Sequence, residues 1–123
     1  MTSENFGNVL YEGQSFSIEQ SDDFARWLKK LRDSNGRARI LKRLRRLADG
    51  QFGDCEPVGE GVHELRMFFG PGYRVYFKQQ GNVVILLLVG GDKDSQAGDI
   101  ARAKALAKEF GDGNEGTRED DAL

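Results

Sequence analysis

Three strand-like segments with short turns between them decide the fold: VHELRMFF at residues 62–69, YRVYFKQ at 73–79 and NVVILLLV at 82–89. In the first two segments, apolar and polar residues alternate, as they do in a strand with one buried face. The turns at 70–72 (GPG) and 80–81 (QG) are short enough to connect only antiparallel neighbours. The sequence therefore predicts a three-stranded antiparallel meander whose last strand, apolar on both faces, is central and covered on both sides.

Amphipathic helices are expected on either side of this meander. The first begins with Ser21 as its N-cap and ends at 34–36 (SNG), and the second follows at once and ends near Gly50. Two helices joined by a short turn favour an antiparallel hairpin. A loop is expected at 51–61 and a final helix at about 95–110. The predicted fold is thus α+β, with an N-terminal helical hairpin packed on a small antiparallel meander and a C-terminal helix.

The length of 123 residues allows a single core. We expect one domain at 15–111, opening with a short strand at 15–19, between a flexible acidic lead-in (1–14) and an acidic disordered tail (112–123). The longest apolar run is far shorter than the roughly 20 residues of a membrane-spanning helix, and no secretory signal is recognisable, so the cytoplasm is the expected compartment. Cys55 is the only cysteine, which excludes an intrachain disulfide and a structural zinc site of the usual kind.

A strongly basic centre lies behind the net charge of −2. The stretch 26–46 has ten basic residues against one acidic residue, Asp33. Such a local density attracts phosphate whatever the charge of the whole molecule. The candidate RNA-binding residues are Arg37, Arg39, Lys42, Arg43, Arg45 and Arg46. A solvated helix face and a docking surface for an acidic protein are alternative interpretations of the same charge.

The turn at 70–72 sets the expected register of the meander. Placing Phe69 opposite Tyr73 puts six apolar side chains on one face, which is the predicted core face: Leu65, Met67, Phe69, Tyr73, Val75 and Phe77. A slip of one residue would bury two arginines in the apolar layer, at a cost of several kcal/mol for each unpaired charge.

The opposite, open face of the meander then carries the candidate catalytic residues Arg66, Arg74 and Tyr76, with Lys93 just beyond the last strand. Guanidinium groups hold phosphate bidentately, a phenol stacks on a base or exchanges a proton, and an ammonium balances charge on a pentavalent phosphate. These are components of a metal-free ribonuclease, for which no cofactor is expected. The alternative is an ordinary solvated face on which the charged groups pair with one another.

Several strings in a fixed order resemble the RelE/ParE superfamily of toxins from type II toxin–antitoxin systems, in its phage Gp49-like, HigB-like branch. The resemblance runs from about residue 16 to about residue 110. The strings that carry it are GD at 53–54, PVGEGV at 57–62, ELR at 64–66, GPGYRVYF at 70–77, LLL at 86–88 and GGDK at 90–93.

This resemblance implies a growth-blocking toxin held inactive by an antitoxin encoded beside it, usually a helix-turn-helix DNA-binding protein. It implies a metal-independent endoribonuclease that cleaves mRNA in the ribosomal A site, with the ribose 2′-OH attacking the adjacent phosphate. By the same resemblance, Arg66 and Arg74 bind the scissile phosphate, Tyr76 positions or stacks on the nucleotide, and Lys93 supplies charge or a proton. Many ribosome-dependent relatives have a histidine or tyrosine where this chain has Asp92 and Lys93, so the general base stays unassigned.

Two other functions remain open at this point. The superfamily includes toxins that poison DNA gyrase by binding it and need no nuclease site. A repression module that binds its antitoxin but has lost its toxic activity is the third alternative. Codon-aligned cuts in mRNA would distinguish the nuclease from a gyrase poison, which leaves mRNA intact and traps gyrase–DNA breaks.

Overall fold

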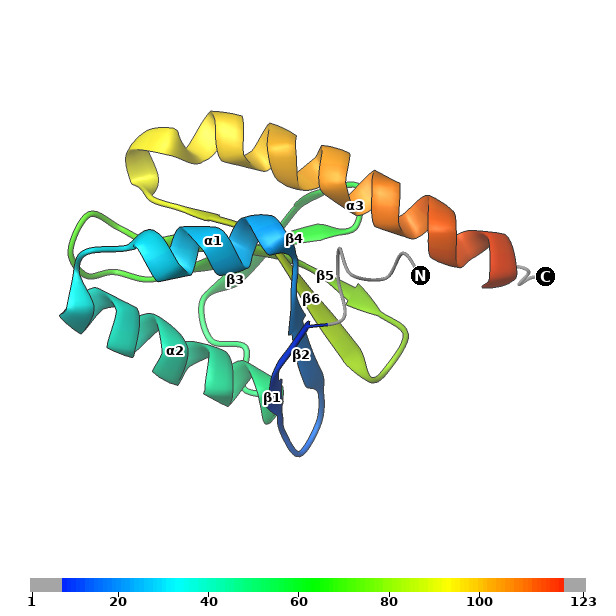
Figure 1. Ribbon diagram of the computed structural model, residues 1–123, viewed down its shortest axis with the longest axis horizontal. Helices are drawn as coiled ribbons and strands as arrows, with labels where there is room; N and C mark the ends of the chain where they lie inside the picture. Colours follow the sequence, from blue (N-terminus) through cyan, green and yellow to red (C-terminus); the bar gives the residue numbers. More distant parts are fainter. Residues whose placement is uncertain (1–7, 119–123) are drawn as a thin grey trace.

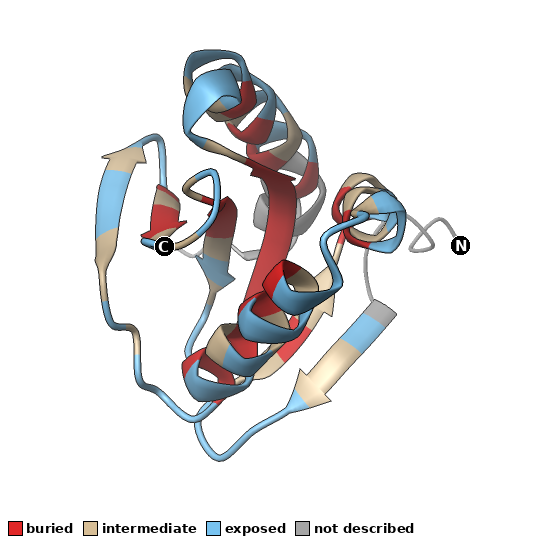
Figure 2. Cartoon of the chain, turned by 90° about the vertical axis from the view of Figure 1, so that its left-hand side faces the viewer, coloured by how far each residue is buried: buried red, intermediate tan, exposed pale blue. Residues whose placement is uncertain are grey.

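Strand β6 (Val84–Gly91) lies at the centre of the structure (Figure 2). The computed structural model describes the backbone of residues 8–118 and the side chains of residues 9–110. The other elements, in chain order, are β1 (Asn8–Glu12), β2 (Ser17–Gln20), α1 (Asp22–Lys30), α2 (Ser34–Ala48), β3 (Cys55–Gly59), β4 (Val62–Arg66), β5 (Arg74–Gln80), the short 3-10 helix η2 (Lys93–Ser95) and α3 (Gln96–Arg118) (Figure 1).

The strands form one mixed sheet in the order β1-β2-β6-β5-β4-β3. Strand β2 runs parallel to β6, with Ser17 opposite Val84 and Gln20 opposite Leu87. The pairs β1–β2, β6–β5, β5–β4 and β4–β3 are antiparallel. The meander β4-β5-β6 is therefore present, but it is half of a larger sheet that the N-terminal strands complete.

The predicted fold, an N-terminal helical hairpin on a small antiparallel meander, is wrong. Two strands precede the helices, and the sheet is mixed and has six strands. The two helices pack mainly on strands: α1 on β6 and β2, and α2 on β1 and β2. The reason is that a central strand such as β6 needs a hydrogen-bonding neighbour on each edge. Strand β5 supplies one edge, and β2, from the other end of the chain, supplies the second.

Both edge strands fall in segments that were expected to be irregular. Strand β3 lies in the predicted loop at 51–61, where Pro57 and several glycines conceal it; proline is tolerated there because β3 is an edge strand. Strand β1 lies in the predicted lead-in. At the other end, α3 extends to Arg118, into the predicted tail, and the remainder of the lead-in and tail lies outside the described residues. No helix within residues 8–118 has the length and apolar character needed to cross a membrane.

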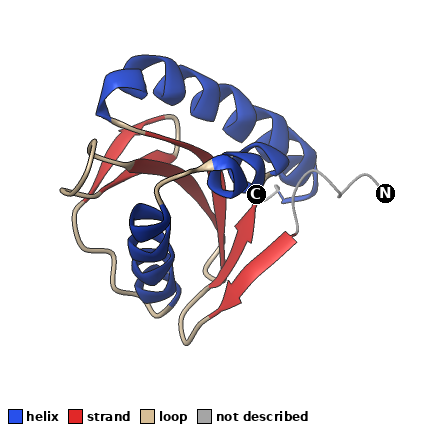
Figure 3. Ribbon diagram, turned by 60° about the vertical axis from the view of Figure 1, so that its left-hand side comes forward, coloured by secondary structure: helices blue, strands red, loops and turns tan. Residues whose placement is uncertain are grey.

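The helices cover opposite faces of the sheet (Figure 3). Ile85 and Leu87 of β6 belong to the core beneath α1 and α2, together with Phe24 of α1. Leu86 and Leu88 face the other way and pack with α3. These four side chains of β6 are fully buried. The prediction that the last strand of the meander is covered on both faces is therefore confirmed.

The predicted facing of β4 and β5 is confirmed, although the predicted register is wrong by two residues. Arg66, not Phe68, stands opposite Arg74, and Leu65 stands opposite Val75. The Met67 amide donates to the Tyr73 carbonyl at 3.0 Å, so the connection spans 68–72 and is longer than the predicted turn. A shift of two residues leaves each side chain on its expected face.

Helix α1 lies in close contact with the sheet at Gly90, through the ring of Trp27. A Cβ atom at this position would lie 2.2 Å from Cε3 of Trp27. The Trp27 ring also makes an edge contact with Tyr73 at 6.2 Å and a tilted contact with Phe24 at 5.6 Å, so neighbouring aromatic rings restrict its movement. The absence of a side chain at Gly90 is thus what lets α1 lie against β6.

We therefore expect Gly90→Ala to lower the free energy of unfolding by about 1–3 kcal/mol, since overpacking a filled contact forces side chains off their rotamers. Gly98→Ala is the matched control, because no atom lies within 4 Å of its added Cβ and the residue is helical. Urea denaturation of both variants measures the difference. Equal stabilities of Gly90→Ala and wild type would show that Trp27 moves aside at no cost.

Helix α2 is attached to the sheet through Asp33. Its carboxylate accepts the Gly36 amide at 2.9 Å, which caps the helix, and the Tyr73 hydroxyl at 2.8 Å. Burial, followed by the hydrogen bond to Asp33, raises the pKa of Tyr73 to about 12. The Gly36 amide, followed by the Tyr73 hydroxyl, lowers the pKa of Asp33.

This link predicts a loss of stability in alkaline solution. Unfolded tyrosine ionises near pH 10, whereas folded Tyr73 keeps its proton up to about pH 12. Between these two values the unfolded state binds fewer protons, so the free energy of unfolding falls as the pH rises. Tyr73→Phe should make this fall shallower, as measured by chemical denaturation across that pH range. The same pH dependence in wild type and variant would contradict the assignment.

Candidate nucleic-acid interface

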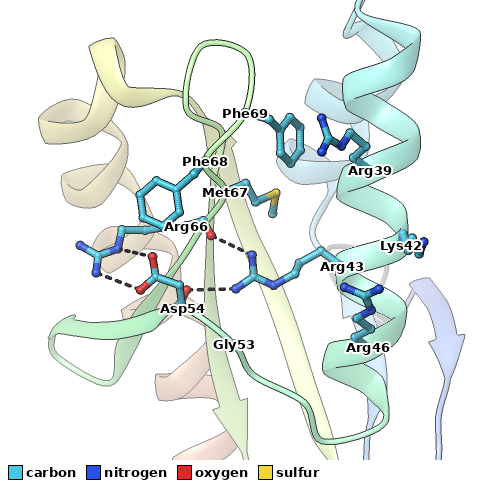
Figure 4. Close-up of a pocket in the computed structure, with 10 residues that line it drawn as sticks. All are labelled: Arg39, Lys42, Arg43, Arg46, Gly53, Asp54, Arg66, Met67, Phe68 and Phe69. Atoms are coloured by element: carbon cyan, nitrogen blue, oxygen red, sulfur yellow. Dashed lines mark hydrogen bonds and ion pairs between the residues drawn. The ribbon is translucent and has the colours of Figure 1, made fainter.

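A groove of about 460 Å³ lies between helix α2 and the opposite wall, which the loop before β3 and the end of β4 form (Figure 4). Its helical wall consists of four basic side chains, and the other wall is formed by the loop before β3 and the end of β4 with the residues that follow it. The lining residues of the two walls are Arg39, Lys42, Arg43 and Arg46, and Gly53, Asp54 and residues 66–69.

The spacing of the four basic residues in α2 creates the cationic wall. Arg39, Lys42, Arg43 and Arg46 follow one another at intervals of three, one and three residues, which places them on one stripe of a helix. The neighbouring face of α2 carries Ile40, which is fully buried. The amphipathic pattern that packs α2 on the sheet therefore also orients its cations toward the groove.

Arg43 joins the two walls of the groove through hydrogen bonds. Its Nη1 donates to the Arg66 carbonyl at 2.8 Å, and its Nη2 donates to the Phe52 and Asp54 carbonyls at 3.1 Å each. Burial lowers the pKa of this guanidinium, and the negative charge of Asp54 opposes the effect. Because its donors are used to join α2 to both parts of the opposite wall, Arg43 is a structural residue and not a free phosphate ligand.

Arg66 is neutralised by two carboxylates at the edge of the groove. Its Nε and Nη2 donate to the two Asp54 oxygens at 3.2 and 3.0 Å, and Nη2 also donates to Glu56 at 2.9 Å. The hydrogen bond with Asp54 is the main reason that the pKa of Arg66 is raised. A phosphate would have to replace at least one of these carboxylates to bind Arg66.

Three groove cations stay available to a ligand. Within residues 9–110, the Lys42 and Arg46 side chains form no ion pair or hydrogen bond. The Arg39 guanidinium lies 4.3 Å from the centre of the Phe69 ring, a cation–π contact that leaves its N–H donors unused. Asp54, which faces the same groove, is already paired with Arg66. The groove is therefore electropositive.

Two of the candidate RNA-binding residues lie elsewhere. Arg37 donates through Nη2 to the Leu31 carbonyl and through Nε to the Leu28 carbonyl at 3.4 Å, so it satisfies the carbonyl end of α1. The Arg45 guanidinium lies 4.9 Å from the centre of the Tyr11 ring, beside β1. Of the six predicted RNA-binding residues, four line the groove, and one of these four is occupied structurally.

The predicted catalytic residues do not share an open face, because α3 covers it. Tyr76 is fully buried and Arg74 is 8% exposed. The Tyr76 hydroxyl donates to Glu64 Oε2 at 2.8 Å, and Gln96 of α3 donates to the same oxygen at 2.7 Å. Arg74 Nε lies 3.6 Å from this oxygen, an ion pair longer than a hydrogen bond. The expectation of an open surface is therefore wrong, since the apolar side chains of α3 need this face of the sheet.

Burial, followed by the bond to Glu64, raises the pKa of Tyr76. This hydroxyl is consequently protonated at neutral pH, and its proton is used in the hydrogen bond to Glu64. Its contact with Glu64 makes it a positioning residue for the Glu64–Arg74 pair.

Lys93 is exposed, and its side chain lies beside Gly72 in the connection between β4 and β5. A Cβ atom at Gly72 would lie 3.3 Å from Lys93 Cβ and 3.9 Å from Arg74 Nη1, so the guanidinium of Arg74 and the aliphatic stem of Lys93 both border this glycine. The structure thus brings Arg74 and Lys93 together near Gly72, brings Tyr76 to Arg74 through Glu64, and places Arg66 in a separate carboxylate pair.

Asp54 and Phe68 of the groove were not predicted from the sequence as site residues. Asp54 stood in a predicted loop, and nothing in its neighbourhood indicates that it pairs with Arg66. Phe68 was expected on the sheet opposite Arg74, but it lies in the connection that follows β4 and is 78% exposed. The consecutive phenylalanines at 68 and 69 were the available signal, because alternation lets only one of two neighbours face the core.

The chain is 45% identical over 97 residues to an uncharacterized protein of Haemophilus influenzae, in an alignment that covers 79% of this chain and 98% of the relative. The chain belongs to the family of that protein. No family model matches the sequence. No solved structure matches it either.

The structural role of Arg43 gives a stability prediction. Arg43→Gln removes the donors of three backbone carbonyls and should lower the free energy of unfolding by about 2–3 kcal/mol. Arg46→Gln is the matched control on the same stripe and should change it by no more than about 0.5 kcal/mol. Thermal and urea denaturation measure both. Equal effects of the two substitutions would mean that Arg43 does not join the walls of the groove.

Proposed function

We propose that this protein is the toxin of a type II toxin–antitoxin module, and that it blocks translation by binding RNA on the ribosome and cleaving mRNA without a metal. The observation that carries the proposal is the groove beside α2, in which Arg39, Lys42 and Arg46 face solvent with no carboxylate paired to them among residues 9–110. The resemblance to RelE/ParE toxins adds the biological context. Translation takes place in the cytoplasm, which is the location this function requires.

RNA backbone is the ligand that the groove chemistry favours. Arginine binds phosphate oxygens through paired N–H groups, and lysine adds a compact positive charge. Asp54 lines the groove, but its charge is balanced by Arg66 and therefore repels a phosphate little. Each phosphate that a cation neutralises on a single strand contributes roughly −0.7 to the slope of log K against log salt. Three such contacts give binding that is sensitive to salt.

Cleavage in this proposal is an internal transfer within RNA. The 2′-hydroxyl gives up its proton to water as its oxygen attacks the adjacent phosphorus, the bond to the 5′-oxygen breaks, and that oxygen takes up a proton from water. The products carry a 2′,3′-cyclic phosphate and a 5′-hydroxyl. Negative charge grows on the phosphoryl oxygens, where preorganised cations lower the barrier. We assign this role to Arg74 and Lys93 beside Gly72, with Arg66 joining them once a phosphate replaces Asp54. Tyr76 acts indirectly, by holding Glu64 against Arg74.

An antitoxin partner follows from the same electrostatics. A protein that neutralises this toxin has to cover the cationic wall, and an acidic segment matches it in charge. We propose a cognate antitoxin, of the helix-turn-helix DNA-binding type that the resemblance implies, as that partner. Co-purification with the product of the neighbouring reading frame tests the partnership.

The function is tested by expression in a bacterial host followed by primer extension on cellular mRNA. We expect wild type to arrest growth and to produce codon-aligned cuts, whereas the double variant Lys42→Gln/Arg46→Gln should restore growth and shallow the salt dependence of RNA binding by roughly 1.4. Arg45→Gln is the matched control, because it removes a charge from the same helix outside the groove.

Other outcomes separate the alternatives. Intact mRNA together with trapped gyrase–DNA breaks would replace the nuclease with a gyrase poison. Growth arrest that is equally strong in the double variant and in Arg45→Gln would remove the groove from the mechanism. Cleavage that persists in Arg74→Ala would remove Arg74 from the chemical step.

A further inference from the structure

Phe68 is a large apolar side chain that the fold does not use. It is 78% exposed, and no other aromatic side chain within residues 9–110 is exposed to a comparable extent. Burying a phenylalanine stabilises a protein through its large apolar area. The Phe68 ring instead stands at the groove, near the Arg66–Asp54 pair and across from the cations of α2 (Figure 4).

The backbone that carries Phe68 is fixed. On one side the Met67 amide donates to the Tyr73 carbonyl, and on the other the Gly72 amide donates to the Phe69 carbonyl, each at 3.0 Å. The neighbouring Phe69 ring packs against Tyr73 with the ring centres 5.8 Å apart. The ring of Phe68 therefore projects into solvent from a β4–β5 connection whose backbone is fixed by hydrogen bonds.

The surroundings of Phe68 match one kind of ligand. An exposed aromatic face binds an unstacked nucleobase, while cations across a groove bind the phosphates of the same strand. Lys42 and Arg46 supply the cations, and Arg39 lies stacked on Phe69 next to them. The bases of a duplex are already stacked inside the helix and offer no free face to Phe68.

We propose that Phe68 is a base-stacking residue and that the groove takes single-stranded RNA, with one base on Phe68 and its flanking phosphates on Lys42 and Arg46. This inference rests on the proposed function, since it names the form of RNA that the groove binds. It adds a residue that contributes affinity through the base, independently of the charges that bind the backbone.

The test is the binding of a fluorescein-labelled single-stranded RNA decamer and a blunt RNA duplex to the full chain at several salt concentrations. Phe68→Ala should weaken binding of the single strand by roughly 5- to 150-fold without changing the salt slope. Lys42→Gln/Arg46→Gln should also weaken binding, but it should make the salt slope shallower. Val83→Ala, at another exposed apolar residue, is the matched control and should bind as wild type does. Phe68→Trp should retain binding, and its added indole fluorescence should be quenched by the strand.

Several results would overturn the stacking role, and each points elsewhere. If Phe68→Ala binds the single strand as tightly as wild type while the double charge variant binds weakly, Phe68 has no role and the groove remains an RNA site. If Phe68→Ala weakens single strand and duplex equally, stacking is excluded. If Phe68→Ala binds both RNAs as wild type does but binds a poly-glutamate peptide more weakly, the ring serves an acidic protein partner. If wild type binds neither RNA, the proposed function fails together with this inference. Thermal denaturation of each variant verifies that it is folded.

Discussion

Strand β6 imposes the constraint on which the rest of the structure depends. It is apolar on both faces and central, so it requires helices above and below and a hydrogen-bonded strand on each edge. Helices α1 and α2 meet the first requirement on one face and α3 on the other. The edge requirement draws β2 into parallel pairing and thereby fixes where α1 starts: the Ser21 hydroxyl accepts the Phe24 amide as N-cap and also donates to the Leu88 carbonyl of β6 at 2.7 Å.

The same packing decides which cations are available for function. Backbone carbonyls accept hydrogen bonds from Arg37 and Arg43, and carboxylates pair with Arg66 and Arg74. Arg39, Lys42 and Arg46 lie on the stripe of α2 that faces the groove beside β4, and no carboxylate among residues 9–110 pairs with them. The positive potential at the groove therefore depends on which basic side chains are paired within the protein and which are left unpaired.

The range of the contacts decided what could be predicted from the sequence. Local patterns were sufficient for the alternation in β4 and β5, for the continuous apolar run of β6, for the Ser21 cap and for the cationic density of α2. They failed where a partner comes from a distant segment: the parallel β2–β6 pair, the cover that α3 places over Tyr76, and the neutralisation of Arg66 by Asp54. Ser34-Asn35-Gly36 illustrates the limit, because a string typical of a helix stop opens α2 once Asp33 caps it.

The parallel pairing of β2 with β6 also governs the order of events during synthesis. Ser17 and Val84 stand opposite each other although 67 residues separate them along the chain, the same span that the Ser21–Leu88 bond bridges. Contacts of such long range form slowly, and the early strands cannot complete the sheet before β6 has emerged from the ribosome. A protein that attacks translation, as proposed, would therefore acquire its native architecture only after a ribosome has synthesised and released β6.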